Sequence, residues 1–142
     1  MENNEIVKKD TELTFVSNAS KTYSSFRPKN TEERKMLFNA LEKCDVKLND
    51  IVGQIIKVKN VIINEYPRKD KETGEEMSNG HRTILIDDEG KSYVTASNYF
   101  FIAFAKLINT FGEPDTWEEP MEIKIVKKSV KNGNQALGFE LV

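Results

Sequence analysis

Few side chains in this sequence are of the types that catalyse reactions or bind metal ions. Asp87, Asp88 and Glu89 are three consecutive carboxylates, which a hydrolase could use to hold two metal ions. The chain also has a single cysteine, Cys44, and a single histidine, His81. Together they exclude an internal disulfide and fall short of the four ligands of a structural zinc site. Because a tight turn between two strands also explains the carboxylates, we predict no catalytic residue, no metal site and no cofactor, and we expect the protein not to be an enzyme.

Aromatic and basic side chains lie close together at several points along the chain. A ring can stack on any nucleobase and a Lys or Arg side chain can neutralise a phosphate, so this combination is typical of surfaces that bind single-stranded nucleic acid. The candidate residues for such a surface are Tyr23, Phe26, Arg27, Lys57, Lys59, Tyr66, Arg68, Lys69, Arg82, Tyr93, Lys124, Lys128 and Lys131. The competing interpretation is that the lysines are ordinary charges on strand edges and that Phe26 packs against the core.

Length and composition indicate one folded unit. Of the 142 residues, 38% are hydrophobic and 31% are charged, which is enough apolar material for a single core. The formal net charge of -2 excludes a uniformly basic protein. Residues 54–71 and residues 124–142 nevertheless carry a net charge of +3 each, so the cations are concentrated in two segments.

The first part of the chain predicts an arm followed by a helix. Residues 1–30 are polar and show no sustained period, and we interpret them as an arm in which residues 12–16 could add a short edge strand. Asn30 and Glu33 have the spacing of a capping box, which marks a helix start. Apolar residues at helical spacing then predict an amphipathic helix over residues 31–43, with Cys44 as a small core residue.

Three strands are predicted in the middle of the chain. β-Branched residues after Gly53 predict the first, over residues 55–63, and residues 64–80 show no period and are predicted to form a long loop. Residues 82–87 and 91–97 are the other two strands, joined by a tight turn at residues 88–90. Val94 and Ala96 suit the interior, so strand alternation predicts that Tyr93 points outward.

A second helix and two more strands complete the predicted elements. Apolar positions four and three residues apart predict a helix over residues 99–111, with Ser97 or Asn98 as its cap and Gly112 as its stop. Four phenylalanines are expected in the core, namely Phe100, Phe104, Phe111 and Phe139, and Trp117 is expected to pack. Strands over residues 121–130 and 136–142 are joined by a turn at residues 132–133.

This order of elements favours a mainly β fold, a five-stranded OB-fold Greek-key barrel with a helix between strands three and four. We therefore predict an arm over residues 1–30 and a single OB-fold domain over residues 31–142, which includes the extra N-terminal helix. An α+β sheet covered by two helices is the alternative. OB folds bind oligonucleotides on the face of strands two and three, beside the loops after strands one and four. The two positive segments coincide with these loops.

Six short stretches from residue 23 onward carry a family resemblance. They are YSSF at 23–26, LFNAL at 37–41, RTILI at 82–86, GKSY at 90–93, FGEP at 111–114 and WEEP at 117–120. These stretches resemble the single-stranded DNA-binding proteins of tailed phages that infect Gram-positive bacteria. The resemblance implies an OB-fold protein that coats the displaced strand during phage DNA replication, without sequence preference and without enzymatic activity.

We therefore predict a non-sequence-specific single-stranded DNA-binding protein of phage DNA replication or recombination, which holds the strand by base stacking and a cationic groove. Single-stranded DNA is the predicted partner, and replication or recombination proteins are further candidates. The alternative is a protein-interaction module that binds a host protein. The first residues do not form a signal peptide and no apolar run is long enough to span a membrane, so we expect the protein in the host cell cytoplasm.

Overall fold

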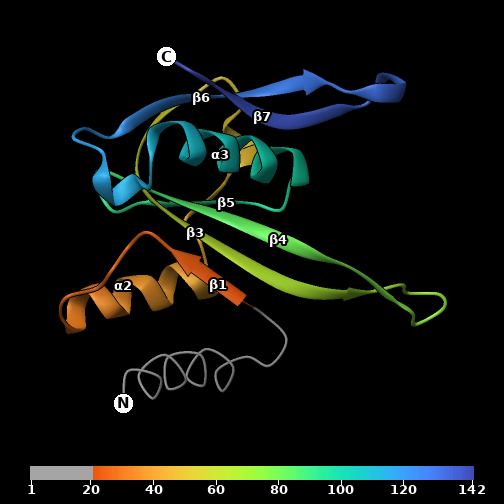
Figure 1. The fold of residues 1–142 in the computed structure, drawn as a ribbon, viewed down its shortest axis with the longest axis horizontal. Coiled ribbons are helices and arrows are strands. Elements are labelled where there is room, and N and C mark those ends of the chain that lie inside the picture. Colours follow the sequence, from red (N-terminus) through yellow and green to blue (C-terminus); the bar gives the residue numbers. More distant parts are fainter. Residues whose placement is uncertain (1–20) are drawn as a thin grey trace.

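A curled, mixed β-sheet with two helices makes up the fold in the computed structural model, which describes residues 21–142 (Figure 1). The helices are α2 (Thr31–Glu42) and α3 (Asn98–Phe111), and three short 3-10 helices are η1 (Leu48–Ile51), η2 (Pro114–Thr116) and η3 (Lys131–Gly133). The strands are β1 (Lys21–Ser24), β2 (Val46–Lys47), β3 (Ile55–Lys69), β4 (Glu76–Asp87), β5 (Ser92–Thr95), β6 (Met121–Ser129) and β7 (Gln135–Leu141). The predicted arm strand at residues 12–16 lies outside the described residues.

The long strand β3 organises the sheet. The strand order is β2-β5-β4-β3-β6-β7, and all neighbours are antiparallel except β2 and β5. On the edge of β3 away from β4, residues 55–58 pair with β6 and residues 62–65 pair with β1. The result is a mainly β half-barrel that is consistent with an OB-like barrel. Within residues 21–142 no ladder closes the sheet between β5 and β7, but the Ser97 hydroxyl donates a hydrogen bond of 3.2 Å to the Leu137 carbonyl oxygen.

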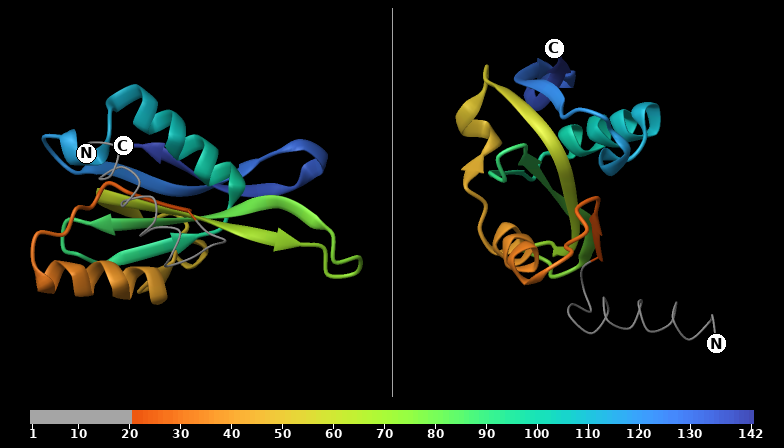
Figure 2. Two further views of the ribbon diagram at one scale, coloured as in Figure 1. Left: turned by 60° about the horizontal axis from the view of Figure 1, so that its bottom comes forward. Right: turned by 90° about the vertical axis from the view of Figure 1, so that its left-hand side faces the viewer.

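Apolar side chains are buried on both faces of the sheet, and each face has its own helix (Figure 2). On the face of α3, Leu85 and Tyr93 pack with Phe100 and Phe104 in the larger cluster. On the opposite face, the smaller cluster consists of Ala40 from α2 with Ile62, Ile84 and Ile86, and Leu37, Leu41, Cys44 and Val94 pack around it. Helix α2 therefore covers part of β4 and β5.

Both helices begin and end where the sequence predicts, to within one residue. The side chain of Asn30 accepts a hydrogen bond from the Glu33 N–H, and the Glu33 carboxylate accepts one from the Lys29 N–H, so donors at the start of α2 are satisfied. Ser97 caps α3 by accepting from the Phe100 N–H. Gly112 ends α3 with a φ of 87°, a value that side chains disfavour.

The prediction of a long loop over residues 64–80 is wrong. These residues form a two-stranded hairpin, because β3 continues to Lys69 and β4 begins at Glu76. Asp70 makes the turn: its side chain accepts hydrogen bonds from the N–H groups of Glu72 and Thr73. The sequence conceals these strands because most of their residues are exposed, so no alternation of polar and apolar residues marks them.

Phe111 and Cys44 both lie at the margin of the core. Phe111, expected in the core, is 50% exposed because it is the last residue of α3 and lies beyond the turn that packs on the sheet. Cys44 packs at the edge of the smaller cluster and is half-buried. Among residues 21–142, no helix has the length and apolar character needed to cross a membrane.

Candidate nucleic-acid interface

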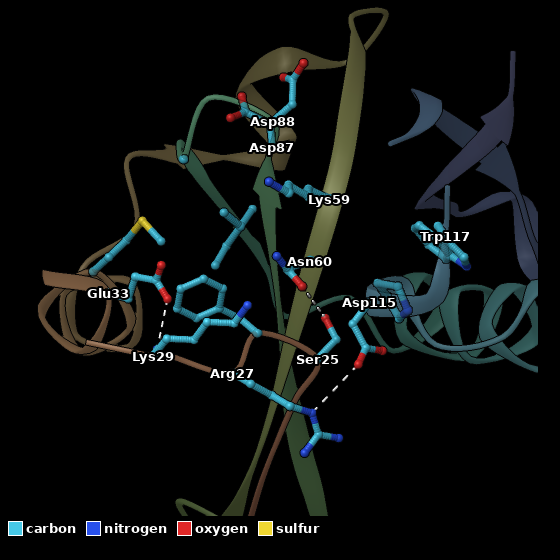
Figure 3. Close-up of a pocket in the computed structure, with 15 residues that line it drawn as sticks. Ser25, Arg27, Lys29, Glu33, Lys59, Asn60, Asp87, Asp88, Asp115 and Trp117 are labelled. Carbon is cyan, nitrogen blue, oxygen red and sulfur yellow. Dashed lines mark hydrogen bonds and ion pairs between the residues drawn. The ribbon is translucent and has the colours of Figure 1, made fainter. Parts of the chain in front are cut away.

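A cavity of about 620 Å³ opens beside the first half of β3, between the start of α2 and η2 (Figure 3). Its walls come from the linker between β1 and α2, from the first half of α2, from the first half of β3, from the β4–β5 turn and from η2. Three of the predicted binding residues line it, namely Phe26, Arg27 and Lys59. Sequence positions more than thirty residues apart are thus brought to one site.

Ser25 fixes the linker against β3. It is buried, its N–H donates to the Val61 carbonyl oxygen at 2.9 Å, and its hydroxyl accepts from the Val61 N–H at 2.9 Å. The same hydroxyl lies 3.0 Å from the side-chain oxygen of Asn60 (Figure 3). The β3–β4 register shifts between Val58 and Asn60, which marks a bulge at Lys59. The linker that carries Phe26 and Arg27 is therefore fixed against β3, close to Lys59.

Some charged side chains of the cavity have a partner within the protein and others do not. The Arg27 Nε lies 3.8 Å from the Asp115 carboxylate, and the Glu33 carboxylate is occupied by the Lys29 N–H (Figure 3). Within residues 21–142, no carboxylate lies within 4.0 Å of the Lys59 ammonium group. Lys59 is exposed, so its charge is available to a phosphate.

Trp117 lines the same cavity and was expected only to pack. Trp117 also packs against the larger core cluster, as expected. Its Nε1 donates a hydrogen bond of 3.0 Å to the Gly112 carbonyl oxygen at the end of α3. Carboxylates flank it in the sequence, which conceals its position in the lining of the same cavity as Phe26. Only the approach of η2 to the linker, a long-range contact, makes the two aromatic residues part of one site.

Tyr23 is adjacent to this site but is engaged elsewhere. Its hydroxyl donates a hydrogen bond of 2.8 Å to Glu113 Oε1. Burial raises the pKa of Tyr23 to about 12, and the hydrogen bond to Glu113 adds to this effect. Tyr23 and Arg27 thus join the N-terminal segment to η2 through Glu113 and Asp115.

The outward orientation predicted for Tyr93 is wrong. Tyr93 is only 8% exposed, and its ring packs in the larger core cluster beside Leu85, its cross-strand partner. Its hydroxyl donates a hydrogen bond of 2.7 Å to Asp87 Oδ2. Burial, with the hydrogen bond to Asp87, raises the pKa of Tyr93. The prediction from strand alternation is wrong because both faces of β5 are covered. Tyr93 lies on the face of α3, and Val94 packs on the opposite face, which α2 covers.

Arg82 also has a structural partner. Its guanidinium Nη2 donates a hydrogen bond of 2.6 Å to the Leu41 carbonyl oxygen, near the end of α2. The side chain is half-buried between β4 and α2. Arg82 therefore ties the helix to the sheet, and this position does not favour a contact with a phosphate.

The carboxylates at residues 87–89 form a turn. Asp87 Oδ1 accepts hydrogen bonds from the N–H groups of Glu89 and Lys91, and Gly90 has a φ of 86°. These contacts account for the Asp87 carboxylate as part of the turn. Among residues 21–142, no group of three or more His, Cys, Asp or Glu side chains is arranged to hold one.

The remaining predicted residues lie on strands and hairpins. Tyr66 packs on the backbone of Gly80, where an added Cβ would come within 2.5 Å of the ring, and Arg68 donates from its Nε to the Ser78 carbonyl oxygen at 2.9 Å. Lys69, Lys57, Lys124 and Lys131 are exposed, and Lys128 is half-buried. The β3–β4 and β6–β7 hairpins project from the same end of the sheet, away from the cavity (Figures 1 and 2).

A comparison with known families identifies the chain. Residues 16–142 match the Phi29-type family model described as phage single-stranded DNA-binding protein. The chain belongs to this family. A search of curated proteins and a search of solved structures each gave no match.

Because the chain belongs to the phage single-stranded DNA-binding protein family, the lining of the cavity can be compared with what binding of a single strand requires. Binding of a single strand without sequence readout requires aromatic faces for the bases and cations for the phosphates. The cavity combines Phe26 and Trp117 with Arg27, Lys29 and Lys59. Four carboxylates also line it, those of Glu33, Asp87, Asp88 and Asp115. Lys29 and Trp117 were absent from the predicted set, and no local sequence pattern distinguishes them.

Proposed function

We propose that the protein binds single-stranded DNA without sequence preference, as a non-enzymatic component of phage DNA replication or recombination. The observation that carries this proposal is the cavity beside β3, in a chain of the phage single-stranded DNA-binding family. Its volume of about 620 Å³ is within the range of about 300–1,000 Å³ of ligand sites in proteins. The cavity can therefore accept at least one nucleotide.

In this proposal a base stacks on Phe26 or Trp117, while Lys59 and Arg27 neutralise the phosphates on either side of it. The Arg27–Asp115 pair is long, at 3.8 Å, and Arg27 is exposed, so the guanidinium group can exchange this contact for a phosphate at little cost. Stacking on a ring needs no base-specific hydrogen bond, which accounts for the lack of sequence preference.

We also propose that the half-barrel is an OB fold, with β3, β4, β5, β6 and β7 as its five strands and α3 between the third and fourth. Pairing of β3 with both β4 and β6 supports this assignment, as does the placement of α3. The usual OB-fold binding face on the second and third strands corresponds to β4 and β5, which α2 partly covers. This cover favours a site beside α2, where the cavity lies.

A titration of labelled oligonucleotides with the full chain at several salt concentrations tests the function. We expect single-stranded DNA to bind more tightly than duplex DNA of equal length, with an affinity that falls as salt rises. Oligothymidine and oligoadenine should bind with similar affinities. Equal affinity for single-stranded and duplex DNA at low salt would contradict the proposal.

Two substitutions test the cavity. Phe26→Ala should weaken binding by about 5–150-fold, the equivalent of about 1–3 kcal/mol for one lost base stack, and by a similar factor for different sequences. Phe38→Ala is the matched control, because Phe38 is 62% exposed on α2 and does not line the cavity. Wild-type affinity of the Phe26→Ala variant would remove this ring from the site.

The second substitution, Lys59→Ala, should reduce the slope of log affinity against log salt by about 0.7, the contribution of one phosphate contact on a single strand. Lys47→Ala on β2 removes an exposed lysine outside the cavity and serves as the control. An unchanged slope in the Lys59→Ala variant would place the phosphates elsewhere.

A further inference from the structure

Tyr99 and Lys128 share the space above a glycine at the opposite end of α3 from the cavity. A Cβ added to Gly138 on β7 would come within 3.1 Å of Tyr99 Cε1 and within 3.4 Å of Lys128 Cγ. The ring and the aliphatic part of the lysine therefore lie side by side over bare backbone. Because Gly138 has no side chain, both can approach the backbone of the hairpin formed by β6 and β7 closely.

Neither polar end of this pair is engaged by the described protein. Tyr99 is 40% exposed, although its helix is otherwise anchored by the buried Phe100 and Phe104. Among the side chains that the structure describes, the Tyr99 hydroxyl has no hydrogen-bond partner and no carboxylate lies within 4.0 Å of the Lys128 ammonium group. Lys128 is half-buried, and its Cγ and Cδ lie against Gly138, as is common for the aliphatic part of a lysine side chain. An exposed ring beside an unpaired cation is a suitable surface for a nucleotide.

The two ends of α3 set the separation of this pair from the cavity. Tyr99 lies in the first turn of α3, whereas Pro114 and Trp117 of the cavity follow directly after its last turn (Figure 1). The 14 residues of α3 make it about 20 Å long, at a rise of about 1.5 Å per residue. One strand of several nucleotides can span this distance, since single OB folds cover about 4–16 nucleotides.

We propose that Tyr99 and Lys128 form a second contact for the same DNA strand, in which a base stacks on Tyr99 and an adjacent phosphate pairs with Lys128. This proposal rests on the proposed function, because it extends the path of the strand from the cavity along α3. Lys131, exposed in η3 at the tip of the hairpin, continues the cationic surface. The contact requires Gly138, whose missing side chain allows the ring and the lysine to lie together.

Binding of short and long oligothymidines by the full chain tests the second contact. The measured quantity is the gain in affinity when the oligonucleotide is lengthened from about 4 to about 16 nucleotides, the limits for single OB folds. Tyr99→Ala should reduce this gain by about 5–150-fold, whereas Tyr99→Phe, which keeps the ring, should leave it unchanged. Ile102→Ala is the control on the same helix, where Ile102 is 46% exposed and offers no ring. Thermal unfolding of each variant verifies that it is folded.

A crosslinking experiment gives an independent result. Wild-type protein irradiated with an oligonucleotide that contains 5-bromouracil should yield a crosslink at Tyr99, located by mass spectrometry of the digested complex. If the wild type binds single-stranded DNA but Tyr99→Ala retains the full gain with length, the second contact is wrong and the proposed function stands. If the wild type shows no preference for single-stranded DNA over duplex DNA, the second contact and the proposed function are both wrong.

Discussion

At the scale of single residues, Tyr93 shows how a candidate contact can instead be part of the core. Its ring lies in the larger cluster and its hydroxyl binds Asp87, which in turn organises the β4–β5 turn. Removing the hydroxyl leaves a buried carboxylate oxygen of Asp87 without this partner. The consequence is a loss of stability and not a loss of DNA contact.

Tyr93→Phe should lower the free energy of unfolding by about 1–3 kcal/mol, because a hydrogen bond to a charged, buried acceptor is lost. Urea unfolding measures this change. The affinity for single-stranded DNA, measured where the variant remains folded, should equal that of the wild type. A weaker affinity without a loss of stability would return Tyr93 to the binding surface.

Tyr23 provides a residue-scale prediction of pH dependence. Burial and the hydrogen bond to Glu113 raise its pKa from the ordinary 10.0 to about 12 in the folded protein. The folded state thus holds this proton more tightly than the unfolded state, so its stabilising contribution is complete below pH 10 and is lost as the pH rises through about 12. Tyr23→Phe should therefore lose less stability than the wild type between pH 10 and pH 12, as measured by urea midpoints. Parallel losses in the two proteins would contradict the assigned pKa.

At the scale of elements, α2 is held to the sheet by few contacts. Ala40 is its only fully buried residue, and Arg82 provides a hydrogen bond from β4 to the Leu41 carbonyl oxygen near its end. The helix covers β4 and β5, so its attachment determines how much of the sheet face is accessible.

Arg82→Met, which keeps an unbranched chain but removes the donor, should loosen the attachment of α2. We expect faster hydrogen exchange for the amides of residues 34–42, with little change in β3 and β4. Lys35→Met on the exposed side of α2 is the control. Unchanged exchange in α2 would show that its apolar contacts alone hold the helix.

The elements also show what sequence patterns can and cannot predict. The caps at Asn30 and Ser97 and the stop at Gly112 are local signals, so both helices were predicted closely. The β3–β4 hairpin was missed because an exposed ribbon carries no apolar period. The orientation of Tyr93 was missed because apolar residues occur on both faces of β5, and only the position of α2 decides between them. Of the residues that line the cavity, local patterns singled out Phe26, Arg27 and Lys59 as candidates. The place of Trp117 in the cavity and that of Tyr99 beside Gly138 depend on contacts between distant elements.

At the scale of the whole molecule, Ser97 has two structural roles at the open side of the sheet: it caps α3 and it contacts β7. Its hydroxyl accepts from the Phe100 N–H as the cap of α3 and donates to the Leu137 carbonyl oxygen of β7. Ser97 is therefore a direct link across the gap between the end of β5 and β7.

Two variants separate these functions. Ser97→Ala loses both hydrogen bonds and should destabilise the protein by about 1–2 kcal/mol, whereas Ser97→Asp keeps the cap but has no proton to donate to Leu137. The Asp variant should therefore be intermediate in thermal unfolding temperature. If Ser97→Asp equals the wild type, the link to β7 contributes nothing to stability.

Trp117 has a practical consequence for every binding experiment above. It is the only tryptophan in the chain, it lines the cavity, and its indole N–H is held by the Gly112 carbonyl oxygen. Its intrinsic fluorescence is therefore a label that the fold itself places at the proposed site. Quenching of that emission on addition of unlabelled oligonucleotides would report occupation of the cavity alone, while strand contacts near Tyr99 would leave it unaffected.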